Sequence, residues 1–306
     1  MDPSADQPLI SVLIPTRNRA VLVQETIRSV LTQQWGHFEL VISNNNSSDN
    51  TQEVLEEIAA GDKRVRVVSP PELLPMTAHW NWAWSQLRGK YGALLSDDDL
   101  WEPTFLGTMA EAVREHPDLD VAATDFLFWK EGDERPLQHR DANLKQYAGV
   151  VPDPLQATLK HNLFFLNCSI MRRETFAELG GYGPTFVGDY ELFVKAALAG
   201  KQFYYIPEAH LKYRVHATQA TDSKLIRLTA EMLEGYIHRS DLPWGVRQRI
   251  RRTAGGTWAL VGQYQRTERK PEEAAPMACF LRGVKVCPWH PANWVGIAQS
   301  VLPSRT

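Results

Sequence analysis

The first 116 residues alternate between two patterns of hydrophobic positions. Short, continuous apolar runs of strand length occupy residues 9–15, 38–43, 65–69 and 91–96. After each run, apolar residues recur every three or four positions, as on one face of a helix; the first such stretch carries Val23, Ile27, Val30 and Leu31. Later helical stretches are expected around 54–58, at 77–87 and at 103–116. Strand and helix therefore alternate four times with short connections.

This alternation predicts an α/β fold with a doubly wound, mostly parallel sheet and helices on both of its faces. Ligands of such sheets bind beyond the carboxyl ends of the strands. The segments at those ends, 15–19, 43–49 and 96–99, are all strongly polar. The fold alone thus predicts a ligand cleft that these three segments line.

The pattern becomes less regular after residue 120. The stretch DYELFVKAALAG predicts a helix with Asp189 at its N-terminus and Gly200 at its C-terminal cap. Strands are expected at 121–129, 164–173 and 202–207, and a loop at 131–140. The central part of the chain is therefore expected to extend the sheet.

Charge separates the C-terminal part of the chain from the rest. The 306 residues carry a net charge of −3, yet residues 225–306 hold 12 Lys and Arg against 6 Asp and Glu. From about residue 224 the sequence is helical, with breaks near Pro243, Pro271 and Pro276. We therefore expect an α/β domain at 1–223 and a helical region at 224–306. Because the α/β domain is acidic, a nucleic-acid enzyme is not expected.

The composition is that of a folded cytoplasmic protein, with 43% hydrophobic and 23% charged residues. The opening MDPSADQPLI lacks the basic and apolar regions of a signal peptide. No stretch approaches the ~20 apolar residues that span a bilayer. The three cysteines, Cys168, Cys279 and Cys287, lack metal-ligand spacing and are expected to be reduced.

Three consecutive carboxylates, Asp97, Asp98 and Asp99, follow the fourth expected strand in GALLSDDDLWEP. Phosphate-binding and dinucleotide-binding glycine motifs and a G-x-S-x-G elbow are all absent from the sequence. Clustered carboxylates at the mouth of an α/β sheet favour a hard cation, Mg²⁺ or Mn²⁺, that bridges to a diphosphate. The alternative is that these aspartates only cap the helix that follows.

Four segments, in order, resemble the family 2 glycosyltransferases, which have the GT-A fold. They are SVLIPTRNRAVLVQETIRSVLTQQWGHFELVISNNNSSDNT, AHWNWAWSQLRGKYGALLSDDDLWEP, CSIMRRETFAELGGYGPTFVGDYELFVKAALAG and YRVHATQAT, and they cover about residues 8–222. The resemblance implies that the α/β domain is a nucleotide-sugar-binding catalytic domain of the GT-A type.

The resemblance also assigns donor-binding residues. Pro15, Thr16 and Asn18 match the first nucleotide-binding turn, with Arg17 where an aromatic residue is usual. Asn44 and Asn45 stand where the family has paired aspartates that bind the donor base; amides can pair with uracil or thymine but carry no charge. Asn81, beside the ribose, and Asp97 are further donor-site residues that the resemblance implies. Apart from the resemblance, Trp101 is a candidate because it closely follows the aspartates and an aromatic face can stack on a sugar ring.

The same resemblance assigns the metal ligands and the base. The first carboxylate of the usual D-x-D-D motif aligns with Ser96, so Asp98 becomes the primary metal ligand and Asp97 and Asp99 contact ribose, water or metal. The alternative register pairs Asp97 with Asp99. His216 is expected to reach the metal from the late segment, and Asp189 is expected to be the general base. The alternative is that Asp189 only caps the helix that follows it.

The expected function is inverting transfer of a sugar from a nucleoside-diphosphate donor, UDP- or dTDP-type, to a hydroxyl acceptor on a cell-surface glycan or glycosylated metabolite. Two alternatives stay open: a non-catalytic nucleotide- or sugar-binding protein on the same scaffold, and a sugar-phosphate nucleotidyltransferase. The basic helical region suits the inner face of the membrane or a homodimer interface, or it packs as a solvated helix.

Overall fold

The structure, a computed structural model, describes residues 10–130, 138–139, 142–215, 223–268 and 275–301. It divides the chain into two compact units, residues 1–184 with 188–217, and residues 185–187 with 218–306. Each unit is described by itself.

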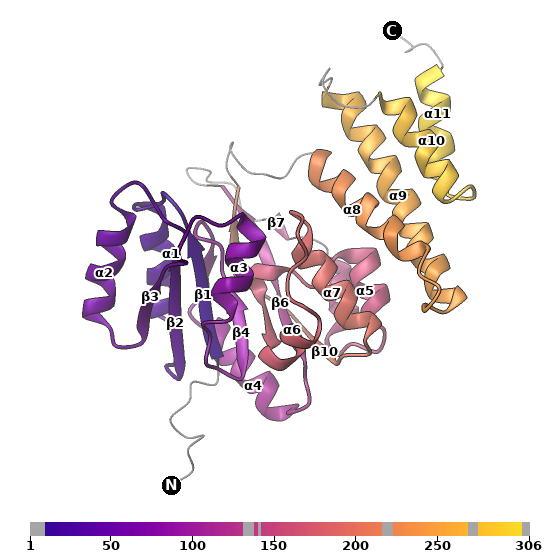
Figure 1. Cartoon of the computed structure of the whole chain (residues 1–306). Coiled ribbons are helices and arrows are strands. Elements are labelled where there is room, and N and C mark those ends of the chain that lie inside the picture. Colours follow the sequence, from indigo (N-terminus) through magenta and orange to yellow (C-terminus); the bar gives the residue numbers. More distant parts are fainter. Residues whose placement is uncertain (1–9, 131–137, 140–141, 216–222, 269–274, 302–306) are drawn as a thin grey trace. The chain divides into compact units, whose positions relative to one another are not determined.

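The first unit is built on one sheet, whose ten described strands lie in the order β3-β2-β1-β4-β9-β6-β10-β5, with β7 beside β6 and β8 beside β10 (Figure 1). The strands are β1 (Ile10–Thr16), β2 (Phe38–Asn44), β3 (Val65–Val68), β4 (Tyr91–Leu94), β5 (Leu100–Trp101), β6 (Val121–Trp129), β7 (Gln138–His139), β8 (Gly149–Val150), β9 (Ser169–Arg172) and β10 (Phe203–Arg214). The half from β3 to β4 is parallel, and β10 is parallel to β6. The predicted α/β fold with a doubly wound sheet is confirmed.

Helices cover both faces of this sheet because side chains alternate along each strand. Ile10, Val12 and Ile14 of β1 pack with apolar residues of one helix group, while Leu13 packs with the other. The first group is α1 (Leu22–Leu31), α2 (Thr51–Gly61) and α4 (Phe105–Glu115); the second is α3 (Met76–Trp84), α5 (Pro154–His161), α6 (Arg173–Glu178) and α7 (Gly188–Leu198). Two 3₁₀ helices, η1 (Ala142–Tyr147) and η2 (Leu166–Cys168), complete the unit.

The second half of the sheet differs from the expectation. The strand expected at 164–173 begins only at Ser169, after η2, and β9 runs antiparallel between β4 and β6. The late strand is longer than expected and continues to Arg214. Its end pairs with β5, directly after the aspartates. This pairing brings Arg214 to the acidic loop.

The second unit consists of α8 (Ser223–Ile237), α9 (Trp244–Glu268), α10 (Pro276–Val286) and α11 (Pro291–Val301), orange to yellow in Figure 1. The helical C-terminal region is therefore confirmed, although Pro271 lies outside the described residues. Ala230, Trp258, Val261 and Cys279 form its core. A Cβ on Gly283 would lie 2.1 Å from Asn293 Oδ1, so only glycine allows this close packing.

All three cysteines are buried and, within the described residues, form no disulfide. No helix in the described ranges combines the length and apolar character that crossing a membrane requires.

Candidate active site

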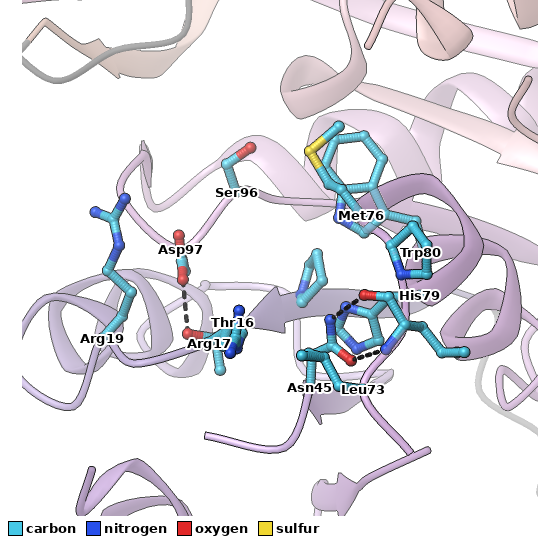
Figure 2. Close-up of a pocket in the computed structure, with 13 residues that line it drawn as sticks. Thr16, Arg17, Arg19, Asn45, Leu73, Met76, His79, Trp80, Ser96 and Asp97 are labelled. Carbon is cyan, nitrogen blue, oxygen red and sulfur yellow. Dashed lines mark hydrogen bonds between the residues drawn. The ribbon is translucent and has the colours of Figure 1, made fainter. Parts of the chain in front are cut away.

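A cavity of about 620 Å³ opens at the carboxyl ends of β1, β2 and β4 (Figure 2). Each polar segment expected at the cleft contributes to it, together with the chain that leads into α3. Its lining residues are Pro15, Thr16, Arg17, Arg19, Asn45, Leu73, Leu74, Pro75, Met76, His79, Trp80, Ser96 and Asp97. Small-molecule sites commonly enclose about 300–1,000 Å³, so the volume suits a nucleotide-sized ligand.

Thr16 and Asp97 connect the loops after β1 and β4. The Thr16 hydroxyl donates to Asp97 Oδ2 at 2.6 Å (Figure 2). Burial raises the pKa of Asp97 to about 6; the neighbouring Asp98 adds to this, while the Thr16 hydrogen bond and the Arg19 charge oppose it. Asp97 is thus a carboxylate in the cavity wall whose proton affinity is increased by burial.

Asp99 points into the protein and is only 1% exposed. Its carboxylate accepts hydrogen bonds from the Arg214 backbone N–H at 2.8 Å and from the Asn167 side-chain amide. Burial raises the pKa of Asp99 to about 8. Asp98, between the two, is half-buried, and its carbonyl oxygen accepts from Arg214 Nε at 2.8 Å. Of the three carboxylates, Asp97 alone lines the cavity.

Asn167 and Arg214 both hold the acidic loop. Asn167 Oδ1 accepts from the backbone N–H of Ser96 at 3.1 Å and from its hydroxyl at 3.0 Å, while its amide donates to Asp99. Arg214 is buried, stacks over the Trp129 ring, and donates through Nη2 to Glu25 Oε2 at 2.5 Å. These contacts fix the backbone from residue 96 to residue 99.

The two asparagines after β2 have different surroundings. Asn45 lines the cavity and forms a two-way pair with the Leu74 backbone, donating to its carbonyl at 2.8 Å and accepting from its N–H at 3.0 Å. Asn44 is buried below the loop, where it donates to Gln52 Oε1 at 2.6 Å and accepts from Ser47. Only Asn45 therefore reaches the cavity.

The side chains of Asn18 and Asn81 each form hydrogen bonds with the backbone of another loop. Asn18 adopts a left-handed backbone, with φ of 54°, and its Oδ1 accepts from the Ser48 N–H at 2.7 Å. Asn81 pairs with the Tyr182 backbone in both directions at 2.9 Å, and a Cβ on Gly181 would lie 2.5 Å from its Oδ1. Neither residue lines the cavity, and Asn81 instead fixes the glycine-rich loop before α7.

Asp189 lies in the first turn of α7, downstream of that loop. Burial raises its pKa, and hydrogen bonds from the backbone N–H groups of Tyr190 and of Asp189 itself only partly offset this. Asp189 also adds to the raised pKa of Tyr182, whose main cause is burial. The residue that the sequence singles out as a base is thus a carboxyl group with increased proton affinity.

A further expected site residue does not join the cavity. Trp101 is 4% exposed, stacks on Phe105 with ring centroids 4.1 Å apart, and donates to the Asn167 carbonyl at 2.6 Å. It lies in the hydrophobic core and has no face open to a sugar. His216 lies outside the described residues.

The family model described as "Glycosyl transferase family 2" matches residues 11–180, more than half of the chain. The chain belongs to glycosyltransferase family 2. Among its relatives, an uncharacterized glycosyltransferase of Haemophilus influenzae is 25% identical over 219 residues, 70% of this chain and 68% of the relative. The putative teichuronic acid biosynthesis glycosyltransferase TuaG of Bacillus subtilis is 32% identical over 109 residues, 36% of this chain and 43% of TuaG.

Solved structures share the fold at low sequence identity. The 1–349 fragment of TarS from S. aureus, in complex with UDP-GlcNAc, superposes with a TM-score of 0.67 and 16% identity, over 91% of this chain and 81% of the fragment. A mannosyltransferase from Pyrobaculum calidifontis, in complex with GDP-Man and Mn²⁺, superposes with a TM-score of 0.61 and 17% identity, over 98% of this chain and 88% of the mannosyltransferase. This family 2 glycosyltransferase therefore has the GT-A fold.

The glycosyltransferase family often uses Mg²⁺ or Mn²⁺, and the acidic loop fits such an ion in part. Among the described residues, no three His, Cys, Asp or Glu side chains are placed to hold an ion by themselves. Asp97 nevertheless offers hard oxygen atoms in the cavity wall, and Asp98 follows it directly in the chain. A hard cation can take its remaining ligands from a diphosphate and water. The loop thus fits an ion that binds together with the nucleotide.

Sequence analysis of this glycosyltransferase missed three residues. His79 lines the cavity, its Nε2 lies 2.7 Å from Ser43 Oγ, and burial lowers its pKa to about 4, so its ring is neutral near pH 7. Asn167 and Arg214 were also missed, because each contacts the acidic loop from more than 60 positions away. No short-range sequence pattern marks any of the three.

Proposed function

We propose that the protein transfers a sugar, with inversion, from a nucleoside diphosphate donor to a hydroxyl group of an acceptor. The observation that carries the proposal is the cavity at the carboxyl ends of β1, β2 and β4, whose polar lining residues include Thr16, Asn45 and Asp97. An open α/β sheet binds its ligands at this edge.

Asn45 is proposed to contact the donor base, with UDP- or dTDP-sugars preferred. Its amide has one N–H and one lone pair beyond those that pair with Leu74. A uracil or thymine ring offers the complementary carbonyl oxygen and N3–H. The neighbours' ligands, UDP-GlcNAc and GDP-Man, support a nucleotide sugar as the ligand class.

The donor diphosphate is proposed to lie between Arg19 and the acidic loop, with Asp98 as the primary ligand of a divalent ion and His216 as a further one. Mg²⁺ or Mn²⁺ would stabilise the charge that grows on the departing diphosphate. Asp99 is proposed to act indirectly, because its bonds to Asn167 and to the Arg214 backbone fix the loop. Ser96 and Asp97 then face the ligand as part of the cavity wall.

Asp189 is proposed as the general base that removes the proton from the acceptor hydroxyl. Its raised pKa brings its proton affinity closer to that useful for a base near neutral pH. Attack by the activated oxygen on the face opposite the leaving diphosphate inverts the anomeric carbon. Asn81 supports this geometry by fixing Tyr182, which lies upstream of α7.

The acceptor is proposed to be a bacterial cell-surface glycan or a glycosylated metabolite. TuaG and a Campylobacter jejuni relative named as a glucosyltransferase of an undecaprenol-linked glycan support the first class. The C. jejuni match spans 109 residues, 35% of each chain.

We place the enzyme in the cytoplasm, at the inner membrane face, with the helical region as the attachment surface or as a homodimer interface.

A donor panel tests this proposal. Purified protein is incubated with UDP-, dTDP- and GDP-sugars, with and without Mn²⁺, and NMR records sugar release, transfer and the anomer formed. We expect turnover of a UDP- or dTDP-sugar and an inverted product. Retention of configuration contradicts the role of Asp189, and tight nucleotide binding without sugar release for any donor indicates a non-catalytic binding protein.

A further inference from the structure

The helical unit contains a groove of about 780 Å³ that the transfer chemistry does not use. It is lined by α8, α9, α10 and the turn before α11. Its two exposed apolar side chains are Leu281, 54% exposed, and Trp289, 59% exposed. Trp294, also exposed, donates from Nε1 to the Pro288 carbonyl at 2.6 Å, which places a second indole beside the same turn.

The charged residues of the groove are mostly basic. Arg251, Arg282 and Lys285 line it, and Glu234 is the one acidic residue among its lining residues. Glu234 is already paired, because Arg282 Nε lies 3.1 Å from its Oε1. Arg251 and Lys285 form no ion pair with another residue that the structure describes. The groove therefore combines apolar contact area with two unneutralised cations.

We propose that this groove binds the surface of an anionic phospholipid membrane. Trp289 and Leu281 enter the boundary between headgroups and acyl chains, where indole rings are favoured because they are apolar with one polar N–H. Arg251 and Lys285 face the lipid phosphates, and each basic residue near an anionic surface strengthens binding. This inference specifies the membrane attachment proposed above and does not depend on the proposed sugar transfer.

Charge favours a membrane over a second copy of the chain. A two-fold interface uses the same patch on both subunits. It would bring the Arg251 and Lys285 cations of one copy towards those of the other, and Glu234 is already committed to Arg282. An anionic lipid surface instead supplies many negative charges opposite these cations.

Vesicle flotation of the full chain tests the proposal, with phosphatidylcholine vesicles that contain or lack phosphatidylglycerol. We expect binding only to the anionic vesicles, weakening as salt is raised. Arg251→Gln with Lys285→Gln should lower vesicle affinity by about 25-fold, about fivefold for each cation. The matched control, Arg239→Gln with Arg266→Gln, removes the same charge from the same unit outside the groove. It should lower vesicle affinity by a few-fold at most.

A second pair of variants tests the apolar part. Trp289→Ala should weaken flotation at least about tenfold, because an exposed indole loses its burial in the lipid boundary. Trp244→Ala, which removes a 70% exposed indole outside the groove, should leave flotation with vesicles unchanged. Circular dichroism and thermal unfolding check that each variant is folded.

Three results overturn the proposal: no binding to anionic vesicles, equal losses in the groove and control variants, or light scattering that shows a dimer which Trp289→Ala converts to a monomer. The last result identifies the groove as a subunit interface. Sugar transfer to a soluble acceptor without vesicles should be unchanged in every variant, so failure of the membrane proposal and failure of the transfer proposal are distinguishable.

Discussion

Replacing Asn167 by alanine tests whether the acidic loop is held in place by contacts from distant parts of the chain. The substitution removes the amide that accepts two hydrogen bonds from Ser96 and donates one to Asp99. The bond from Trp101 Nε1 ends on the Asn167 backbone carbonyl and survives. The loss is therefore confined to the contacts that position residues 96–99.

The expected cost follows from those three bonds. A bond to a charged group is worth about 1.5–3 kcal/mol, and each neutral bond about 1 kcal/mol. Because the partly exposed Ser96 can bind water instead, we expect a total of about 3 kcal/mol. At about 2–4 °C for each kcal/mol in a domain of this size, the melting temperature should fall by about 6–12 °C. Sugar transfer should fall by about tenfold or more, since a small displacement of a reacting group is costly.

Calorimetry and the Mn²⁺ dependence of transfer separate positioning from simple instability. Asn293→Ala is the matched control: it removes another buried amide, which donates to the Gly255 carbonyl at 2.8 Å in the helical unit. The control should lose stability by about 1–2 kcal/mol but keep transfer per folded molecule. Asn167→Ala should need more Mn²⁺ for half-maximal transfer. Wild-type Mn²⁺ dependence and turnover in Asn167→Ala would refute the reasoning.

Further predictions concern the cavity and the base. Asp98→Ala should abolish the Mn²⁺-dependent part of nucleoside diphosphate binding measured by calorimetry; unchanged affinity with Mn²⁺ present removes the metal assignment. Asp189→Asn should lower transfer by about 10²-fold or more while donor binding persists, because asparagine cannot take the acceptor's proton. Since burial raises the pKa of Asp189, the wild-type rate should decline on acidification at a higher pH than for an ordinary carboxylate, and Asp189→Asn should lack this decline. His79→Leu should destabilise the protein by about 1–3 kcal/mol in urea unfolding, because Ser43 Oγ loses its buried partner; an unchanged midpoint argues against that bond.

The parallel half of the sheet follows from local sequence patterns. Four apolar runs with helical stretches between them were sufficient for β1 to β4, because each strand and helix is encoded by its own residues. The antiparallel β9 was not predictable in this way. Its position between β4 and β6 depends on pairing between segments about 50–80 residues apart, which no local period records.

The site residues also divide into those that local sequence indicates and those that depend on contacts from distant parts of the chain. Thr16, Asn45 and Asp97 could be identified because they match family motifs in the polar segments at the ends of strands, and the structure places all three at the cavity. It could not distinguish Asp97 from Asp99, since Asn167 and Arg214 hold the Asp99 carboxylate inside the protein, while the Asp97 carboxylate accepts from Thr16. Trp101 was expected at the donor site but lies in the core, because an aromatic residue next to a polar loop is equally compatible with a core position.

A crystal structure of the protein with UDP and Mn²⁺ tests the proposed donor site. We expect the nucleotide in the 620 Å³ cavity, with the uracil at Asn45 and the diphosphate towards the acidic loop. We also expect an anomalous manganese peak at about 2.1 Å, the metal–oxygen distance of a small hard cation, from a carboxylate oxygen of Asp98. A nucleotide bound outside this cavity, or a manganese peak away from the 97–99 loop, would show that the donor site is wrongly placed.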